Sequence, residues 1–349
     1  MFGIRAAVAV AGSTIICALA AIPPGRCRAA EISAESLRAA ADYSAGHKGR
    51  ALLVIRNGKT VFEEYPNGAS RKTATKIYSG TKAFWNIAAL AAQEDGVLDL
   101  DEPVSATLTE WVGNSQKSRI TLRQLLTFTA GVPETYSLHN DGWVDRDAYA
   151  IKQPLVAQPG SSFIYGPAAL QVFHEVFRRK LATRGETPTR YLERRVLKPL
   201  ELGRQRYLAD KAGNPLLAAG FTMTAGQWVH MGRLMLAGGK PVLHGSISEV
   251  TRGTPVNPMF ALGFWNNRLA GSPGAREVDP EELLELKWFR QEWRGTCLCH
   301  SAPSDLIASI GSGGQRLYVI PSMDLIVVRQ GFITKFSDGT FLRLLLGHA

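Results

Sequence analysis

The spacing of hydrophobic residues changes along the chain, and each change predicts where strands give way to helices. Residues 51–55 form a continuous apolar run, and Asn57-Gly58 separates them from residues 60–65. Asn-Gly between two such segments favours a type I′ turn, so this stretch predicts a β-hairpin. A helix is predicted before it, over residues 33–44, because Ser33 can cap a helix and Leu37 begins an apolar stripe.

Residues 82–95 predict the most strongly hydrophobic helix of the chain, which Gly96 ends. This segment is apolar on nearly every side, so we expect it to be buried in the middle of the protein. Further helices, separated by loops rich in glycine and proline, are predicted over residues 122–126, 168–181, 188–196 and 225–236.

Strand character returns towards the C-terminus. Residues 262–265 predict a short strand, and residues 316–320 and 325–329 predict a second hairpin around the turn 321–324. A closing helix is predicted over residues 339–346. Because strands lie near both ends with helices between them, we expect one domain over residues 31–349. Its α/β lobe would combine residues 31–80 and 255–349, and its helical lobe would span about residues 81–254.

Composition excludes a disordered chain and gives little support to a nucleic-acid partner. Of the 349 residues, 45% are hydrophobic and 20% are charged, which is enough apolar material for a sizeable core. The net charge is +10, yet the longest basic run is the triplet Arg178-Arg179-Lys180. We therefore expect dispersed basic charge and no nucleic-acid binding.

The first 30 residues have the pattern of an export signal. Arg5 precedes the uncharged, mostly apolar residues 6–22, and small residues at 18–20 and 29–30 offer cleavage sites. We predict a signal peptide over residues 1–30 and a periplasmic or secreted protein. The alternative is an uncleaved membrane anchor, but a spanning helix needs ~20 apolar residues, and no later segment is apolar enough to span a bilayer.

Cysteine usage favours neither a disulfide framework nor a metal site. Cys17 and Cys27 lie in the leader, which leaves Cys297 and Cys299. A bridge across one intervening residue would be strained. With His300 the pair supplies too few well-spaced ligands for a tetrahedral site, so we interpret both as structural thiols. The sequence calls for no metal and no other cofactor.

Ser79-Gly80-Thr81-Lys82 stands where the buried helix begins. A serine hydroxyl is a weak nucleophile and needs a nearby base. Spacing i, i+3 on a helix brings the lysine amine to the same face as Ser79, and burial would favour its neutral form. Taken alone, the four residues also fit a capping serine beside an exposed lysine.

Longer stretches around this motif resemble the β-lactamase-related serine hydrolases. That family joins class C β-lactamases, D,D-peptidases, certain esterases and 6-aminohexanoate-dimer hydrolases. The resemblance extends in order over about residues 50–335. It is carried by residues 78–82, 94–104, 120–133, 159–165 and 218–239.

The resemblance implies an α+β fold, in which helices flank a mainly antiparallel sheet and a helical insert lobe borders the active site. It implies Ser79 as nucleophile, Lys82 as its partner and Tyr165 as the general base. It also implies a small-molecule ester or amide as substrate. A phenol acts as a base near neutral pH only where nearby positive charge stabilises its phenolate. Lys82 is the expected source of that charge.

Two departures from the family pattern bear on the substrate. Pro167 stands where the family has an asparagine after the tyrosine, and Gly311-Ser312-Gly313-Gly314-Gln315 lacks the basic residue of the third motif. The glycine run would let backbone N–H groups approach an oxyanion. We expect the backbone N–H of Gly314 or of Gln315 to form the oxyanion hole with the Ser79 N–H. The sequence leaves open which of these two neighbouring residues supplies it.

The same reasoning predicts substrate contacts from Ser312, Gly313 and Trp143. Aromatic side chains near the expected site, among them Tyr136 and Trp265, either line a pocket or pack in the core. An arginine from elsewhere, Arg316 or Arg329, is the alternative source of the missing cation.

Two functions fit this sequence. The first is a serine hydrolase that acts on esters or amides through an acyl-enzyme at Ser79, with weak activity on β-lactams. The second is a non-catalytic penicillin-binding-like sensor or binding protein, which the altered motifs motivate.

Overall fold

A computed structural model describes residues 1, 3, 31–245 and 247–348. The chain divides into two compact units, Met1–Glu31 and Ile32–Ala349. The leader expected over residues 1–30 lies outside the described residues except at positions 1 and 3. The elements described below all belong to the second unit. Among the described residues, no helix combines the length and the apolar character that crossing a membrane requires.

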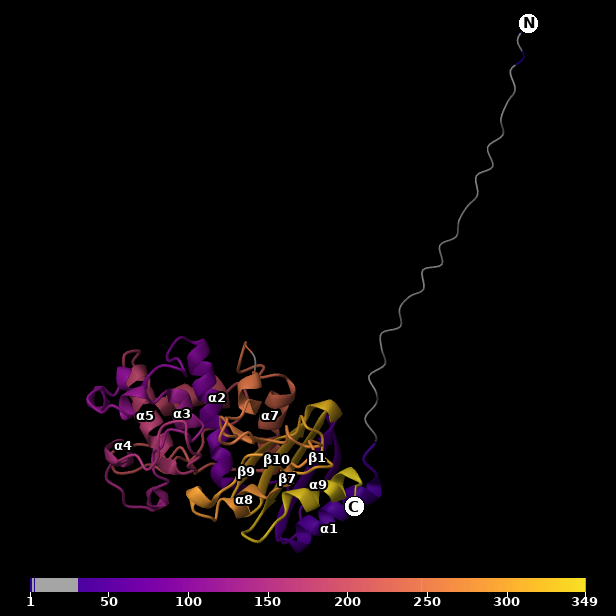
Figure 1. Cartoon of the computed structure of the whole chain (residues 1–349). Helices are drawn as coiled ribbons and strands as arrows, with labels where there is room; N and C mark the ends of the chain where they lie inside the picture. The colour runs from indigo at the N-terminus through magenta and orange to yellow at the C-terminus, as the bar shows by residue number, and fades with distance from the viewer. Residues whose placement is uncertain (2, 4–30, 246, 349) are drawn as a thin grey trace. The chain divides into compact units, whose positions relative to one another are not determined.

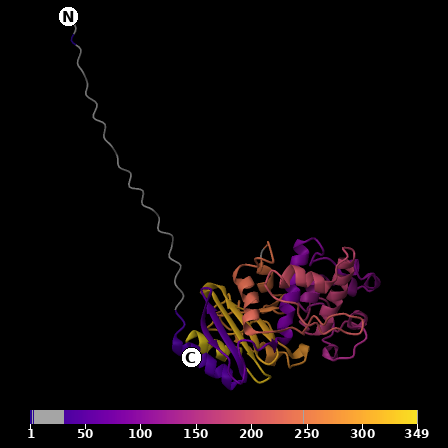
Figure 2. The ribbon, with the colours of Figure 1, turned by 180° about the vertical axis from the view of Figure 1, so that it is seen from behind.

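A seven-stranded antiparallel sheet joins strands from the two ends of the chain (Figures 1 and 2). β1 pairs with β11, so that Val54 lies opposite Val327. The strand order is β2-β1-β11-β10-β9-β6-β5. The bounds are β1 Gly49–Arg56, β2 Lys59–Glu64, β5 Phe260–Ala261, β6 Phe264–Asn266, β9 Ile307–Gly311, β10 Gln315–Ile320 and β11 Leu325–Gly331.

Two short strand pairs lie outside this sheet. β3 Thr75–Lys76 pairs with β4 Thr222–Met223 in antiparallel fashion. β7 Arg276–Glu277 pairs in parallel with β8 Thr296–Cys297. The first pair ends just before Ser79, and the second flanks the segment that borders the site described below.

Both hairpins predicted from the sequence are present. Asn57 and Gly58 both have positive φ, 50° and 73°, as a type I′ turn between β1 and β2 requires. The strand predicted over residues 262–265 is confirmed only in its second half, because Phe264 and Trp265 belong to β6. Leu262 and Gly263, with φ 45° and 83°, instead form the turn between β5 and β6. A four-residue apolar run does not reveal that its glycine reverses the chain.

Helices cover both faces of the sheet. α1 Ala34–Gly46 and α9 Asp338–Leu346 pack together on one face, and α7 Ala225–Leu236 covers the other (Figure 1). Successive side chains of β11 point to opposite faces of the sheet. Ile326 therefore lies against Gly232 of α7, while Arg329 donates to Ser44 of α1 on the other face. α7 falls within the range expected for the helical lobe, but it packs on the sheet.

α2 Thr81–Glu94 runs between the sheet and the other helices (Figure 1). Every residue from Thr81 to Ala92 is buried, as the all-apolar pattern predicts. Beyond it lie α3 Leu122–Leu126, α4 Arg146–Lys152, α5 Pro167–Ala182 and α6 Pro188–Leu192, which continues as a π-helix over Glu193–Leu197. α8 Pro280–Leu283 belongs to the segment between β7 and β8.

Candidate active site

Ser79 lies in the 3₁₀ turn Tyr78–Gly80 that leads directly into α2. Tyr78 has a left-handed backbone, φ 45°, which is unusual for an aromatic residue. The surroundings hold this turn tightly. A side-chain carbon added at Gly80 would lie 2.7 Å from Trp228 of α7, and one added at Gly311 would overlap the carbonyl oxygen of Ile77. Ser79 is therefore fixed between the end of β9 and α7.

The lysine predicted to partner Ser79 contacts it directly. Lys82 Nζ lies 2.7 Å from Ser79 Oγ and donates to the carbonyl oxygen of Ala218 at 3.0 Å. The side chain is buried, with 2% of Lys82 exposed, and burial lowers the pKa of its amine to about 7. A large part of the population is thus neutral at pH 7, and a neutral amine can accept the proton of Ser79.

Tyr165 completes this group just ahead of the N-terminus of α5. Its ring centroid lies 4.6 Å from Lys82 Nζ and 4.7 Å from the ring of Phe128. Burial raises the pKa of Tyr165, and a hydrogen bond with Ser79 only partly opposes that rise. The negative charge of Glu281 raises the same pKa further. These surroundings favour the neutral phenol at pH 7 over the phenolate that the resemblance implies.

These three residues line a cavity of about 450 Å³. Tyr136 and Trp265 also line it, which decides the question that the sequence left open for them. The 3₁₀ turn Tyr136–His139, the segment that contains α8 and the end of β9 supply most of the other walls. The lining also includes His139, Gly166, Glu281, Leu284, Glu285, Ile310, Gly311 and Ser312.

His139, Glu281 and Glu285 are lining residues that the sequence did not indicate. His139 is exposed to solvent, yet partial desolvation by the surrounding protein, together with the charge of Lys82, lowers the pKa of its imidazole to about 4, so the ring is neutral at pH 7. Its Nδ1 lies 3.1 Å from the carbonyl oxygen of Tyr136. All three residues come from irregular segments or a one-turn helix, where no sequence periodicity marks the side that faces a cavity.

The register predicted for the glycine run is displaced. Gly311 is the last residue of β9, and among the described residues of this run only Gly311 and Ser312 line the cavity. The N–H groups of Gly313 and Gly314 donate to Glu281 at 2.6 and 3.3 Å. Gln315 belongs to β10, where its side-chain amide donates to the Gly331 carbonyl oxygen at 2.6 Å. Gly313, Gly314 and Gln315 therefore do not occupy the positions expected of them.

Neither arginine considered as a substitute cation reaches the cavity. Arg316 is fully buried, and its guanidinium pairs with Asp338 at 2.7 Å and with Glu281 at 3.1 Å. Arg329 is also buried and donates to the carbonyl oxygens of Gly313 and Gly314 at 3.1 and 2.8 Å. Both guanidinium groups are occupied by protein acceptors behind the strand end.

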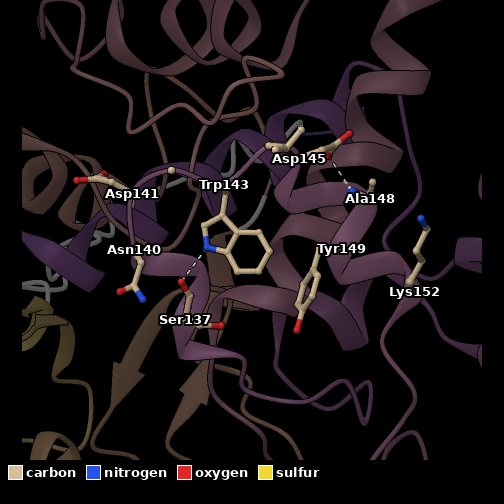
Figure 3. A pocket seen from close by; sticks show the side chains of 10 residues that line it. Ser137, Asn140, Asp141, Trp143, Asp145, Ala148, Tyr149 and Lys152 are labelled. Carbon is tan, nitrogen blue, oxygen red and sulfur yellow. Dashed lines mark hydrogen bonds between the residues drawn. The ribbon is translucent and has the colours of Figure 1, made fainter.

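Trp143 lines a different cavity, of about 610 Å³, on the helical side of the molecule (Figure 3). Its indole Nε1 donates to the carbonyl oxygen of Ser137 at 2.9 Å, and its ring centroid lies 4.6 Å from that of Tyr149. Figure 3 shows both rings beside Asn140, Asp141 and Lys152. The structure does not support the substrate contact predicted for Trp143, because Trp143 does not line the cavity that contains Ser79.

The two described cysteines are free and buried. Cys297 Sγ lies 3.7 Å from His300 Nδ1, and burial raises the pKa of the Cys297 thiol to about 11. Over residues 31–245 and 247–348, no group of three or more His, Cys, Asp and Glu side chains is arranged to hold a metal ion.

Comparison with known proteins identifies the family and the fold. The sequence model described as Beta-lactamase matches residues 35–330. Protein flp of Staphylococcus aureus (strain COL) is 28% identical over 179 residues, which are 46% of this chain and 35% of flp. The chain thus spans about a third of the length of this curated relative.

Two solved structures have the same fold. A class C β-lactamase from Rhodobacter sphaeroides superposes with a TM-score of 0.64 and 19% identity, covering 90% of this chain and 99% of its own. EstCE1, described as a hydrolase with promiscuous acyltransferase activity, has a TM-score of 0.62 and 17% identity, covering 89% and 98%. These likenesses confirm the predicted α+β class and the antiparallel sheet flanked by helices.

Proposed function

Because this chain belongs to the β-lactamase family, whose fold suggests serine hydrolase activity, we propose that it cleaves ester or amide bonds through an acyl-enzyme at Ser79. The observation that carries the proposal is the 2.7 Å contact between Ser79 Oγ and Lys82 Nζ. A serine at a helix N-terminus beside a buried amine has both a nucleophile and a base within hydrogen-bond reach.

The chemistry begins with neutral Lys82. Its amine takes the proton of the Ser79 hydroxyl as Oγ attacks the substrate carbonyl carbon, and a tetrahedral oxyanion forms. When this intermediate collapses, the bond to the leaving oxygen or nitrogen breaks. The proton passes from the Lys82 ammonium through the neutral phenol of Tyr165 to that leaving atom. Water then attacks the acyl-enzyme, with Lys82 again as base, and releases the acid.

We assign the oxyanion hole to the backbone N–H of Ser79 and that of Gly311 or Ser312. The assignment rests on two features: the end of β9 lies against the turn that carries Ser79, and both strand-end residues line the cavity. Donors fixed at the site of the developing charge contribute ~3 kcal/mol or more to lowering the barrier.

The substrates that this site suits best lack a carboxylate beside the scissile bond. Residues 311–315 contain no basic residue, and Pro167 has no side-chain donor. Arg316 and Arg329 are engaged by other protein groups. We therefore propose small esters and amides without a carboxylate as substrates, and β-lactams as poor ones. The leader pattern supports export to the periplasm or beyond the cell as part of this proposal.

The test is covalent labelling with a fluorophosphonate, followed by identification of the modified peptide. We expect label on Ser79 in the wild-type protein and none in Ser79→Ala. Ser312→Ala, which removes the other serine hydroxyl lining the cavity, should keep the label. Hydrolysis of p-nitrophenyl butyrate should disappear with Ser79→Ala. A folded wild-type protein that is neither labelled nor active would support the non-catalytic binding protein instead.

A further inference from the structure

The mouth of the catalytic cavity carries acidic side chains where the family resemblance implies a cation. Glu281 and Glu285, from α8 and the turn after it, both line the cavity. Among the described lining residues, Lys82 is the one basic side chain apart from the neutral imidazole of His139. Lys82 is buried below the mouth, so the rim itself presents only negative charge.

From this arrangement we infer that the hydrolase selects esters or amides that carry a positively charged group, such as an ammonium, close to the scissile bond. The inference rests on the proposed function and names the substrate class for that site. Glu285 is the specificity-determining residue, because its carboxylate is exposed at the rim and no ion pair of the described residues engages it.

Charge behind the strand end does not cancel the acidity of the rim. Arg316 is shared between Glu281 and Asp338, and Asp338 in turn contacts Asp279 through its backbone N–H. Burial and the charge of Asp338 raise the pKa of Asp279 to about 6, so this carboxyl is still mostly ionised at pH 7. The two positive charges of Arg316 and Arg329 are therefore outnumbered by the carboxylates of Glu281, Asp338 and Asp279. Glu285 adds a fourth negative charge.

Aromatic walls would reinforce the preference for a cation. Tyr136 is 47% exposed, and both Tyr136 and Trp265 line the cavity. An ammonium over an aromatic face is attracted by the negative charge above the ring, most strongly where water is excluded. A substrate carboxylate would instead meet Glu285 and Glu281, and like charges brought together oppose binding.

The experiment measures kcat/KM for three butyrate thioesters that release a thiol and differ in one group. Their thiol parts end in a trimethylammonium, a tert-butyl or a carboxylate group. For the wild-type protein we expect the order cation, neutral, anion, with a cation-to-anion ratio that shrinks in high salt. Glu285→Lys should lower this ratio by ~10-fold and Glu285→Gln by ~3-fold, the scale of one or two unit charges near a partly solvated site.

Glu282→Lys is the matched control. Glu282 lies on α8, three residues before Glu285. It is exposed and does not line the cavity, so the same change of charge should leave the ratio within ~2-fold. A ratio that Glu285→Lys leaves unchanged, or that Glu282→Lys changes equally, overturns the inference while hydrolysis of the neutral thioester upholds the proposed function. If the wild-type protein hydrolyses none of the three thioesters and is not labelled at Ser79, both the inference and the proposed function are overturned.

Discussion

Replacing Lys82 with Met should make the protein inactive and, at neutral pH, more stable. The pKa of this amine falls from 10.5 to about 7 because the side chain is buried. A shift of that size corresponds to ~5 kcal/mol that the folded state loses when Lys82 is protonated. Methionine fills similar space without a charge, but it leaves the Ala218 carbonyl oxygen without its 3.0 Å hydrogen bond, at a cost of ~1–3 kcal/mol. The expected net gain at pH 6 is ~2 kcal/mol or more.

The stability difference between the wild-type protein and Lys82→Met should change with pH in a definite direction. Between pH 7 and 10.5 the unfolded chain holds a proton on Lys82 that the folded chain does not. Wild-type stability therefore rises with pH in this window by ~1.4 kcal/mol per unit relative to the methionine variant, which has nothing to titrate there. The advantage of Lys82→Met should thus be full below pH 7 and should shrink as the pH rises, reversing between about pH 8.5 and 10.

The assay is urea unfolding of both proteins at pH 6, 8 and 9.5, with kcat/KM on p-nitrophenyl butyrate measured in parallel. Ser79→Ala is the control, since it removes activity but keeps Lys82 and so should keep the wild-type pH dependence. A stability difference between wild type and Lys82→Met that does not change with pH would refute the reasoning. It would show that Lys82 is not held near neutrality, and the base in the proposed mechanism would be lost.

Three further outcomes are expected. Tyr165→Phe should lower kcat/KM by ~10²-fold or more, and its effect should not add to that of Lys82→Met, because the two groups move one proton; near-wild-type activity would make Tyr165 a packing residue. The wild-type protein should turn over p-nitrophenyl butyrate better than nitrocefin, and nitrocefin turnover at the level of dedicated β-lactamases would contradict the reading of the altered motifs. Gly311→Ala should lower both stability and kcat/KM, because its side chain would overlap the Ile77 carbonyl oxygen, whereas Gly113→Ala, which has open space, should change neither.

Elements whose ends are marked by a capping residue or a turn dipeptide could be predicted closely from the sequence. The helix predicted over residues 225–236 matches α7, and its first turn is capped by Thr224. The turn of the first hairpin was marked by Asn57-Gly58, whose φ values only a few residue types adopt readily. β9 and the β5–β6 turn were missed, since both belong to short, fully buried apolar stretches in which no alternation of polar and apolar residues marks a strand.

The same distinction separates the correct and incorrect parts of the candidate site. Ser79 and Lys82 are three residues apart at one helix terminus, so local geometry alone brings them together. The glycine run depends on where β9 ends against the Ser79 turn, a register set by pairing with β10. Trp143 depends on the course of a loop. The positions of the glycine run and of Trp143 depend on contacts between segments that lie far apart in the sequence. The residue types do not indicate those contacts.

The acidic side chains at the mouth of the cavity and the neutral amine of Lys82 lie in one cavity, although negative charge opposes the low pKa of that amine. A carboxylate close to Lys82 would raise the pKa of its amine and disable it as a base at pH 7. Burial is nevertheless the cause of the Lys82 shift, and no carboxylate opposes it. Glu281 is held away by the Gly313 N–H and by Arg316, while Glu285 stands in solvent at the rim. A cation bound at that rim would lower the Lys82 pKa further, so that binding the preferred substrate would itself favour the neutral amine that attack by Ser79 requires.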